Sequence, residues 1–244
     1  MTTCVAVVDG SQAWLLDAGP DFRQHLALLD GHGAELVGIL LTHGHIGHYT
    51  GLMYLGRETM NAESLRVWAA PRLVSFLKSN GPWEQLVTAG NIDLRVIEPG
   101  NPIRLSDQVR IQAIEVPHRD EYSETVGYLV MGPECSVLYV PDTDGWDEWD
   151  PPVEDHIRRV DIALLDATFF SHDELPGRDL AKIAHPLVTE SLTRFGVLDD
   201  RDLAKIRFTH LNHSNPLLDP SSDEYVSVAR AGIAVAKEGD VYLL

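Results

Sequence analysis

The sequence predicts an α/β fold, and three observations support this prediction. Apolar runs typical of buried strands alternate with amphipathic segments typical of helices. Glycine and proline lie between these segments, where turns are expected. Several residues able to bind a metal lie one or two positions beyond the ends of predicted strands, and strands of one sheet could bring them to a common edge. These residues are His43, His118, Asp142 and His210.

The first part of the chain is predicted to open with a hairpin. Two short apolar runs at 4–8 and 13–16 are separated by the turn-forming segment 9–12. The apolar positions of 21–29 recur at helical spacing, and the glycine-bounded run 35–41 is typical of a buried strand. The elements expected next are a helix at 47–60, a strand at 66–69, a helix at 71–80, and strands at 91–97 and 109–116.

The second part shows the same mixture of strands and helices. A further hairpin is expected at 125–131 and 136–140, followed by a buried strand at 161–166. The remaining expected elements are a helix at 185–195 and strands at 204–208 and 241–244. No internal repeat, low-complexity tract or linker interrupts the pattern, so we expect one domain over residues 1–244.

Composition limits the classes of partner. The chain has 244 residues, 44% of them hydrophobic, as in an ordinary globular protein. Its 37 acidic against 19 basic residues give a formal net charge of −18, which would repel nucleic-acid phosphates and anionic membrane surfaces. We therefore expect a small-molecule substrate, and neither a nucleic-acid nor a membrane partner.

The cysteines and the N-terminal residues bear on localisation. Cys4 and Cys135 form no CxxC pair, which favours free thiols in a reducing compartment. No apolar run is long enough to span a bilayer. The N-terminal residues lack the basic and apolar regions of a signal peptide. A cytoplasmic location is the expectation.

The segment 42–48, Thr-His-Gly-His-Ile-Gly-His, carries the strongest chemical signal. Its histidines follow the spacing H-x-H-x-x-H, and neighbouring imidazoles in a tight loop can face one ion. Neutral imidazole suits zinc, iron and manganese. A solvated histidine-rich loop is the alternative, but the preceding buried strand and the small glycines favour a metal site. The candidate ligands are His43, His45 and His48.

This motif resembles that of the metallo-β-lactamase superfamily, which is usually written H-x-H-x-D-H. Later landmarks of that family recur in the same order. His118 in Val-Pro-His is similar to the family's isolated histidine, Asp142 in Pro-Asp-Thr to its G-D-T element, and His210 in Phe-Thr-His to its final histidine. The resemblance implies a four-layer αββα sandwich with the metals at one edge.

The resemblance also assigns ligands to two metals. The first site would offer imidazoles and an open position for water, as catalytic zinc sites do, and its residues would be His43, His45 and His118. The residues of the second would be His48, Asp142 and His210, with Asp142 bridging the two metals and Asp144 as the fallback ligand. One or two divalent transition metals are therefore expected, zinc first, with iron or manganese as alternatives.

A narrower resemblance is to the PQQ-biosynthesis protein B group of that superfamily. Three stretches carry it: 208–216 (Phe-Thr-His-Leu-Asn-His-Ser-Asn-Pro), 165–169 (Leu-Asp-Ala-Thr-Phe), and the acidic pair Asp173 and Glu174. The resemblance covers nearly the whole chain, from Trp14 onward. That group is associated with an iron-dependent hydroxylation rather than a hydrolysis.

Two departures from the family pattern bear on the site. Gly47 stands where the family has an aspartate that ligates the second metal, so the number of metals stays open between one and two. Relatives also begin with a glycine-rich strand and loop before the first hairpin. The chain lacks this segment, so we expect either an uncovered sheet edge, which would favour a homodimer, or a truncated N-terminus.

Further residues are candidates by position. His185 resembles a proton donor of phosphodiesterase branches of the superfamily, with a structural histidine as the alternative. His213 could line the pocket or support a ligand, and Asp166 could accept a hydrogen bond from a ligand histidine. Arg119 could meet an anionic group or belong to an ordinary charged loop. Trp146 could roof the site or cap the core.

Three functions follow from these residues. The first is hydrolysis of a small ester, lactone or phosphodiester by a metal-bound hydroxide, because a bound divalent metal lowers the pKa of its water to about 7. His185 would then protonate the leaving group. The second is oxidation by a non-haem iron oxygenase acting on a small molecule, as the protein B group implies. The third is a metal-binding relic with impaired catalysis, which the missing aspartate and N-terminal strand suggest.

Overall fold

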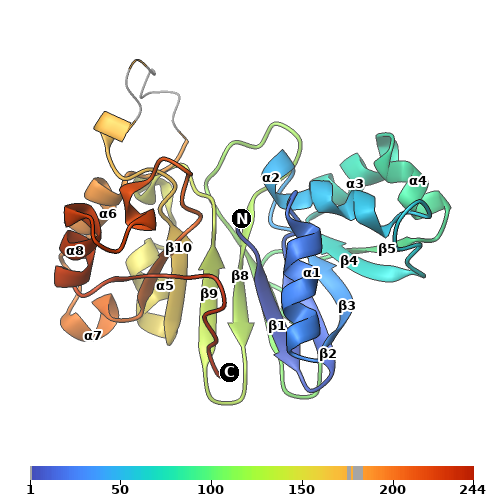
Figure 1. Ribbon diagram of the computed structural model, residues 1–244, viewed down its shortest axis with the longest axis horizontal. Coiled ribbons are helices and arrows are strands. Elements are labelled where there is room, and N and C mark those ends of the chain that lie inside the picture. The colour runs from blue at the N-terminus through green and yellow to red at the C-terminus, as the bar shows by residue number, and fades with distance from the viewer. Residues whose placement is uncertain (1, 175–176, 178–183) are drawn as a thin grey trace. The chain divides into compact units, whose positions relative to one another are not determined.

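The computed structural model describes residues 2–174, 177 and 184–244. The chain divides into two compact units. Unit 1 comprises residues 1–115 and 120–126, and unit 2 comprises residues 116–119 and 127–244. In both units strands and helices alternate along the chain (Figure 1), as the sequence predicts for an α/β fold. The single domain expected over residues 1–244 stays a prediction.

Unit 1 contains a five-stranded sheet with the order β1-β2-β3-β4-β5. β1 and β2 form the predicted hairpin, and Gly10 in its turn has a φ of 58°, which glycine adopts without strain. The pairs β2–β3, β3–β4 and β4–β5 are parallel. The strands are β1 (Val5–Asp9), β2 (Gln12–Leu16), β3 (Glu35–Leu40), β4 (Leu65–Ala69) and β5 (Ile92–Val96).

The helices of unit 1 bury apolar side chains against this sheet. Leu15, Ile39 and Val67 of the strands are fully or almost fully buried in one core with Phe22 and Leu73 of the helices. The remaining elements of unit 1 are α1 (Phe22–Gly31), α2 (Ile46–Tyr49), the 3-10 helix η1 (Thr50–Leu55), α3 (Pro71–Ser79), α4 (Trp83–Thr88), and the hairpin of β6 (Ile103–Arg104) and β7 (Arg110–Glu115).

The prediction of one long helix at 47–60 is wrong. Only α2 is α-helical, and the chain continues as the 3-10 helix η1. The backbone N–H of Gly51 donates to the carbonyl of Ala18 at 2.7 Å. A regular α-helix would instead bond that N–H to the carbonyl of Gly47. A tertiary contact therefore replaces the local hydrogen bond that the helical pattern predicts.

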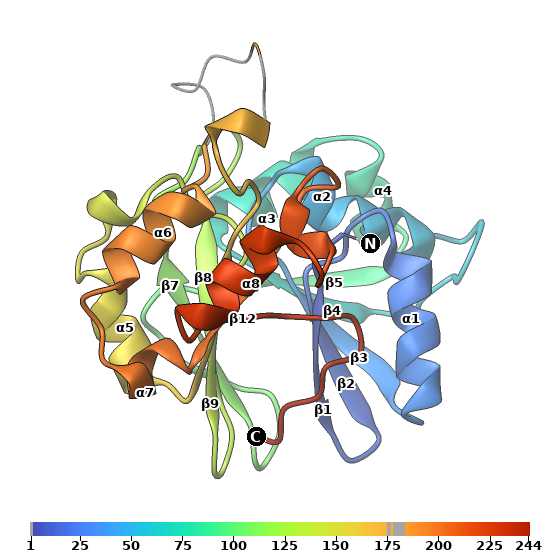
Figure 2. The ribbon, with the colours of Figure 1, turned by 60° about the vertical axis from the view of Figure 1, so that its left-hand side comes forward.

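Unit 2 contains strands in the order β12-β11-β10-β9-β8. β8 and β9 form the second predicted hairpin, and the remaining neighbours pair in parallel. Helices α5, α6, α7 and α8 gather beside these strands (Figures 1 and 2). The strands are β8 (Val126–Met131), β9 (Ser136–Val140), β10 (Ile162–Asp166), β11 (Ile206–Thr209) and β12 (Ala234–Val235). The helices are η2 (Trp146–Glu148), α5 (Val153–Arg159), η3 (His172–Glu174), α6 (Val188–Phe195), α7 (Asp200–Leu203), η5 (Pro216–Leu218) and α8 (Asp223–Arg230).

Two predicted elements of unit 2 differ from the structure. The helix expected at 185–195 begins at Val188, and Pro186 disfavours a helical backbone at the residue before it. Residues 241–244 do not form the expected final strand, and the last described strand is β12. The first error moves the edge of a helix and the second removes a strand, while the α/β pattern stays intact.

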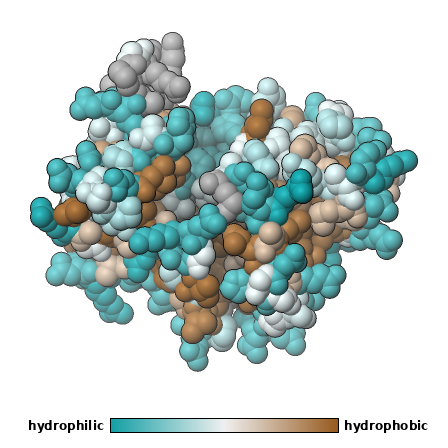
Figure 3. All heavy atoms as spheres, viewed as in Figure 1, coloured by the Kyte–Doolittle hydropathy of each residue, from teal (hydrophilic) through white to brown (hydrophobic). Residues whose placement is uncertain are grey.

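The described helices and surface agree with the composition. None of the described helices is long and apolar enough to cross a membrane. Figure 3 shows hydrophilic residues over much of the visible face, with smaller apolar patches between them. An acidic chain with a net charge of −18 is expected to present such a face.

Candidate metal centre

The three histidines of the 42–48 motif lie where β3 ends and α2 begins. His43 Nε2 and His45 Nδ1 are 2.9 Å apart. The ring centroids of His43 and His48 are 4.2 Å apart. Ring nitrogens this close face a common point, as two ligands of one metal ion do. The structure thus brings together the ligands that the sequence predicts in this segment.

Two of these histidines have their other ring nitrogen against an oxygen of unit 1. Thr42 Oγ1 lies 2.9 Å from His43 Nδ1. Glu121 Oε2 lies 3.0 Å from His45 Nε2. Such contacts fix the orientation of a metal-binding imidazole. The role of Glu121 was not predicted, since 76 positions separate it from its partner and only its place in a charged loop marks it in the sequence.

Asp17, at the end of β2, holds the third histidine. The residue is fully buried. Its Oδ1 accepts hydrogen bonds from the backbone N–H of Thr42 at 2.8 Å and from the Thr42 hydroxyl at 3.0 Å. Its Oδ2 lies 2.8 Å from His48 Nδ1. We call Asp17, Thr42, His43 and His48 the Asp17 array.

The backbone at Asp17 is unusual, and so is the backbone at His210. Their φ angles are 70° and 61°, in the left-handed region that residues other than glycine rarely adopt. Backbone strain of this kind tends to collect at functional sites. No role for Asp17 was predicted. The signal available in the sequence is an acidic residue placed directly after the buried residues Leu15 and Leu16.

Three glycines lie at the contact between the end of β2 and α2, and they differ in their surroundings. A Cβ at Gly19 would collide with the backbone oxygen of Gly47, and one at Gly51 with that of Gly19. In the described part of the chain, a Cβ at Gly47 meets no atom within 4 Å. Packing therefore requires Gly19 and Gly51. It does not require glycine at the position where the family has a metal-binding aspartate.

In unit 2, His118 is held by a neighbouring carboxylate. Its side chain is fully buried, and its Nδ1 lies 2.8 Å from Asp144 Oδ1. The backbone N–H of Asp144 in turn donates to the carbonyl of Pro117 at 2.7 Å. Asp144 was the fallback metal ligand. Its position instead suits orienting the ring of a predicted ligand.

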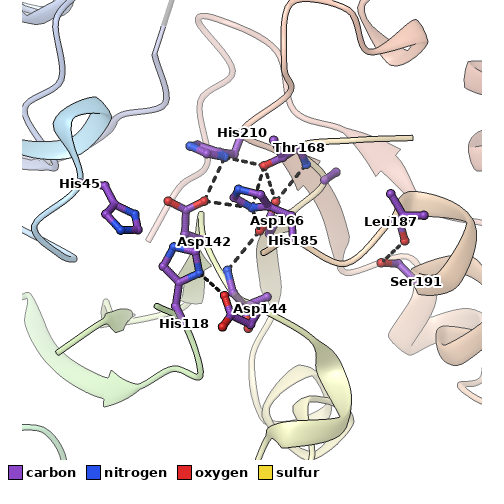
Figure 4. A network of polar contacts seen from close by, with 12 residues as sticks. His45, His118, Asp142, Asp144, Asp166, Thr168, His185, Leu187, Ser191 and His210 are labelled. Carbon is purple, nitrogen blue, oxygen red and sulfur yellow. Dashed lines mark hydrogen bonds and ion pairs between the residues drawn. The ribbon is translucent and has the colours of Figure 1, made fainter. Parts of the chain in front are cut away.

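Four further groups of unit 2 meet from separate segments (Figure 4). The ligand atoms of Asp142, Asp166, His185 and His210 all lie within 4.8 Å of one another. Asp142 Oδ1 is 3.3 Å from the Nδ1 atoms of both His185 and His210. Three of these residues follow or end β9, β10 and β11, and His185 precedes α6. The parallel strands explain why residues so distant in sequence converge.

Asp166 organises this group. It is fully buried, and its Oδ2 lies 2.8 Å from His185 Nδ1. Its Oδ1 accepts from the backbone N–H of Thr168 at 2.9 Å and from its hydroxyl at 2.7 Å. Thr168 Oγ1 also lies 2.7 Å from His210 Nδ1. We call Asp166, Thr168, His185 and His210 the Asp166 array (Figure 4). Asp166 thus contacts the predicted proton donor rather than a predicted ligand, and Thr168 was missed.

The pKa of His185 reflects competing effects. Burial lowers the pKa of its ring, and the charge of Arg119 acts in the same direction. The charge and hydrogen bond of Asp166, together with the charge of Asp142, outweigh them and raise the pKa above its ordinary value. The protonated ring is the form that a proton donor needs.

The other predicted residues lie in different surroundings. Arg119 and His213 are exposed. Trp146 is buried, its indole N–H donates to Ser191 Oγ at 2.8 Å, and its ring centroid is 5.3 Å from that of Phe195. Of the two alternatives for Trp146, the structure favours core packing over a roof above the site.

The donor chemistry fits a transition metal. Imidazole and carboxylate groups suit zinc, iron and manganese. The candidate ligands are mostly buried, and oxygens of the protein restrain their rings. A divalent cation would bind the carboxylate and the ring nitrogens that these restraints leave to it.

Comparisons with known proteins agree with this interpretation. The chain is 24% identical over 262 residues to the coenzyme PQQ synthesis protein B of Xanthomonas campestris pv. campestris (strain B100), covering 96% of this chain and 85% of that protein. The crystal structure of Zn(2+)-bound PqqB from Methylobacterium extorquens matches with a TM-score of 0.83 and 22% identity, over 99% of this chain and 87% of that one.

A second solved structure is a diphosphatase of the PhnP family. Its TM-score is 0.70 at 23% identity, and the match covers 98% of this chain and 82% of that one. These likenesses confirm the predicted fold, a mixed α/β arrangement of two sheets flanked by helices. The family described as the beta-lactamase superfamily domain matches residues 13–192. Because the match extends over more than half of the chain, the chain belongs to the beta-lactamase superfamily.

Proposed function

We propose that the chain is a metal-dependent hydrolase that acts on a small ester, lactone or phosphodiester. One or two divalent transition metals would bind, zinc first. Membership of the superfamily supports the proposal, as does the zinc-bound PqqB neighbour. The proposed metal ligands are His43, His45, His48, His118, Asp142 and His210.

The observation that carries the proposal is the restraint on the ligand histidines. Each of them has one ring nitrogen 2.7–3.0 Å from a protein oxygen. A restrained imidazole directs its second nitrogen in a fixed direction, which is how proteins prepare histidine for a metal. A solvated histidine-rich loop, the alternative raised by the sequence, would need no such restraint.

The chemistry of the site follows from these groups. A divalent metal bound there would polarise the scissile bond and lower the pKa of a coordinated water to about 7. His185, held by Asp166 at 2.8 Å, would donate a proton to the leaving group. The acidic chain disfavours polynucleotides and leaves small substrates as the expected class.

The test is a substrate panel assayed with defined metals. The full chain would be loaded with zinc, manganese or iron(II) and offered small esters, lactones and phosphodiesters. We expect hydrolysis of at least one class, lost on chelation and restored by the metal. His32→Ala, at an exposed position, is the matched control and should behave as wild type. If no metal-loaded form hydrolyses any member of the panel, the hydrolase proposal fails.

The number of metals is a separate question, and Gly47 controls it in our proposal. Elemental analysis should give more metal per chain for Gly47→Asp than for wild type, because the variant adds a carboxylate ligand and so strengthens the second site. The open space at this position lets the variant fold. Gly47→Ala, which adds a Cβ without a carboxylate, should match wild type. Equal stoichiometry in wild type and Gly47→Asp would contradict this proposal.

Oxidation of a small molecule is the second candidate. The likeness to coenzyme PQQ synthesis protein B over 96% of the chain favours it, as does the open space at Gly47. Iron with open coordination positions can activate oxygen. Turnover with zinc under anaerobic conditions would exclude an oxygenase. Turnover that needs both iron and oxygen would exclude the hydrolase.

A further inference from the structure

The Asp17 and Asp166 arrays share four contacts. In each array a fully buried aspartate accepts from the backbone N–H and the hydroxyl of one threonine through Oδ1. In each array its Oδ2 faces the Nδ1 of one histidine at 2.8 Å. The threonine oxygen then faces the Nδ1 of a second histidine. This repeated pattern assigns the threonine the same part in both arrays.

The position of the hydrogens follows from the donors available. An ionised carboxylate only accepts hydrogen bonds, and a threonine hydroxyl has one hydrogen to donate. The Thr168 hydroxyl lies 2.7 Å from Asp166 Oδ1, so its hydrogen points to that oxygen. Its oxygen is then an acceptor toward His210 Nδ1, also at 2.7 Å. His210 must therefore carry its hydrogen on Nδ1, which leaves Nε2 as the nitrogen able to bind a metal.

The opposite arrangement is unfavourable. If the Thr168 hydroxyl donated to His210, its lone pairs would face the carboxylate of Asp166 at 2.7 Å. The same argument holds for Thr42, whose oxygen lies 3.0 Å from Asp17 Oδ1 and 2.9 Å from His43 Nδ1. Leaving a buried polar group facing an unsuitable partner is destabilising.

Thr168 offers His210 Nδ1 the nearer of two acceptors. Asp142 Oδ1 lies 3.3 Å from His210 Nδ1, farther away than the threonine oxygen. Asp142 is also a proposed metal ligand, and an ion bound there would engage its carboxylate. The threonine oxygen is then the acceptor that holds the hydrogen on Nδ1.

We propose that Thr168 is a positioning residue that fixes the tautomer of His210, and that Thr42 does the same for His43. The proposal deepens the proposed function, because both histidines are proposed metal ligands. Its direct consequence, however, concerns the location of a ring hydrogen and is independent of turnover. Neither threonine was identified from the sequence.

The test compares Thr168→Val with Thr42→Val in the full chain. Long-range ¹H–¹⁵N correlation spectra of the histidine rings report which nitrogen carries the hydrogen, with His210→Ala and His43→Ala to assign the signals. We expect Thr168→Val to change the tautomer of His210 and not that of His43, and Thr42→Val to do the reverse. Thr168→Ser, which keeps a hydroxyl, should retain the wild-type tautomer.

A second measurement reads the consequence for the metal. Competition with a chromogenic chelator should show zinc affinity about 10–100-fold weaker in Thr168→Val and within about threefold of wild type in Thr168→Ser. Thr143→Val is the control, because that buried hydroxyl donates to the carbonyl of Pro117 and accepts from the indole N–H of Trp149.

The outcomes separate this inference from the proposed function. An unchanged His210 tautomer in Thr168→Val would overturn the inference, whatever the metal affinity. Wild-type protein that binds no zinc would end the metal proposal, while the tautomer measurement would still decide the role of Thr168. A changed His210 tautomer in both Thr168→Val and Thr168→Ser would show that the shape of the side chain, and not its hydroxyl, is responsible. That result would also overturn the inference.

Discussion

The Asp17 and Asp166 arrays share four contacts, but their residues are distributed differently along the chain. In the Asp17 array the histidines are close in sequence, and the aspartate lies 25 positions before its threonine. In the Asp166 array the aspartate and threonine are two positions apart, and the histidines lie 17 and 42 positions beyond the threonine. Closely spaced histidines form a visible motif, whereas Asp-x-Thr is too common to attract notice. The same chemistry is therefore conspicuous in one unit and hidden in the other.

The largest expected effect tests whether the histidine that faces the aspartate has the same role in both arrays. His185→Gln should lower kcat about 10²–10⁴-fold on the best substrate of the panel, because it removes the proposed proton donor. Its metal content should not change. His48→Gln should instead lower the metal content. Loss of metal from His185→Gln would make His185 a ligand and the two arrays alike in role.

The next effect concerns the two buried aspartates. Asp17→Ala and Asp166→Ala should each lower the free energy of unfolding by about 2–5 kcal/mol, since each leaves several buried donors without their acceptor. Urea denaturation followed by circular dichroism measures this quantity. Asp17→Asn and Asp166→Asn keep one acceptor and should lose less. A loss near zero for either alanine variant would mean that its array is not an organising contact.

The smallest effect concerns the glycines that support the Asp17 array. Gly47→Ala should raise the free energy of unfolding by up to about 1 kcal/mol, because alanine favours the helical backbone and the position has space. Gly51→Ala should lower it, because its Cβ would meet backbone atoms of Ala18 and Gly19. Thermal unfolding of the two variants compares them directly. Equal shifts would show that the close approach at Gly51 relaxes without cost.

The fold was largely predictable because its signals are local. The apolar runs that became β3 and β10, and the hairpin of β1 and β2, are each specified within a few residues. The helix at 47–60 failed because Gly51 bonds to a carbonyl 33 positions earlier, and no local pattern encodes that contact. The helices α4, α5, α7 and α8 were also missed, and each of them is short, with between four and eight residues.

The sequence indicates candidate ligands but not the residues that hold them. Three histidines at motif spacing indicate a metal directly. Asp17, Glu121 and Thr168 act through side chains that only the fold brings together, and their residue types are common at strand ends and in loops. Asp144 shows the same limit, because its place near Asp142 suggested a ligand whereas its contact is with His118.

The contrast between Gly47 and its neighbouring glycines has a consequence for how such a chain changes over generations. At Gly19 and Gly51 any replacement must move backbone, so these positions tolerate little. At Gly47 a side chain can be gained or lost without repacking. A single base change converts two of the four glycine codons to aspartate codons and the other two to glutamate codons, so each gives a carboxylate. One substitution at this position can therefore add or remove a carboxylate ligand. The number of metals bound could then change in evolution while the surrounding fold stays the same.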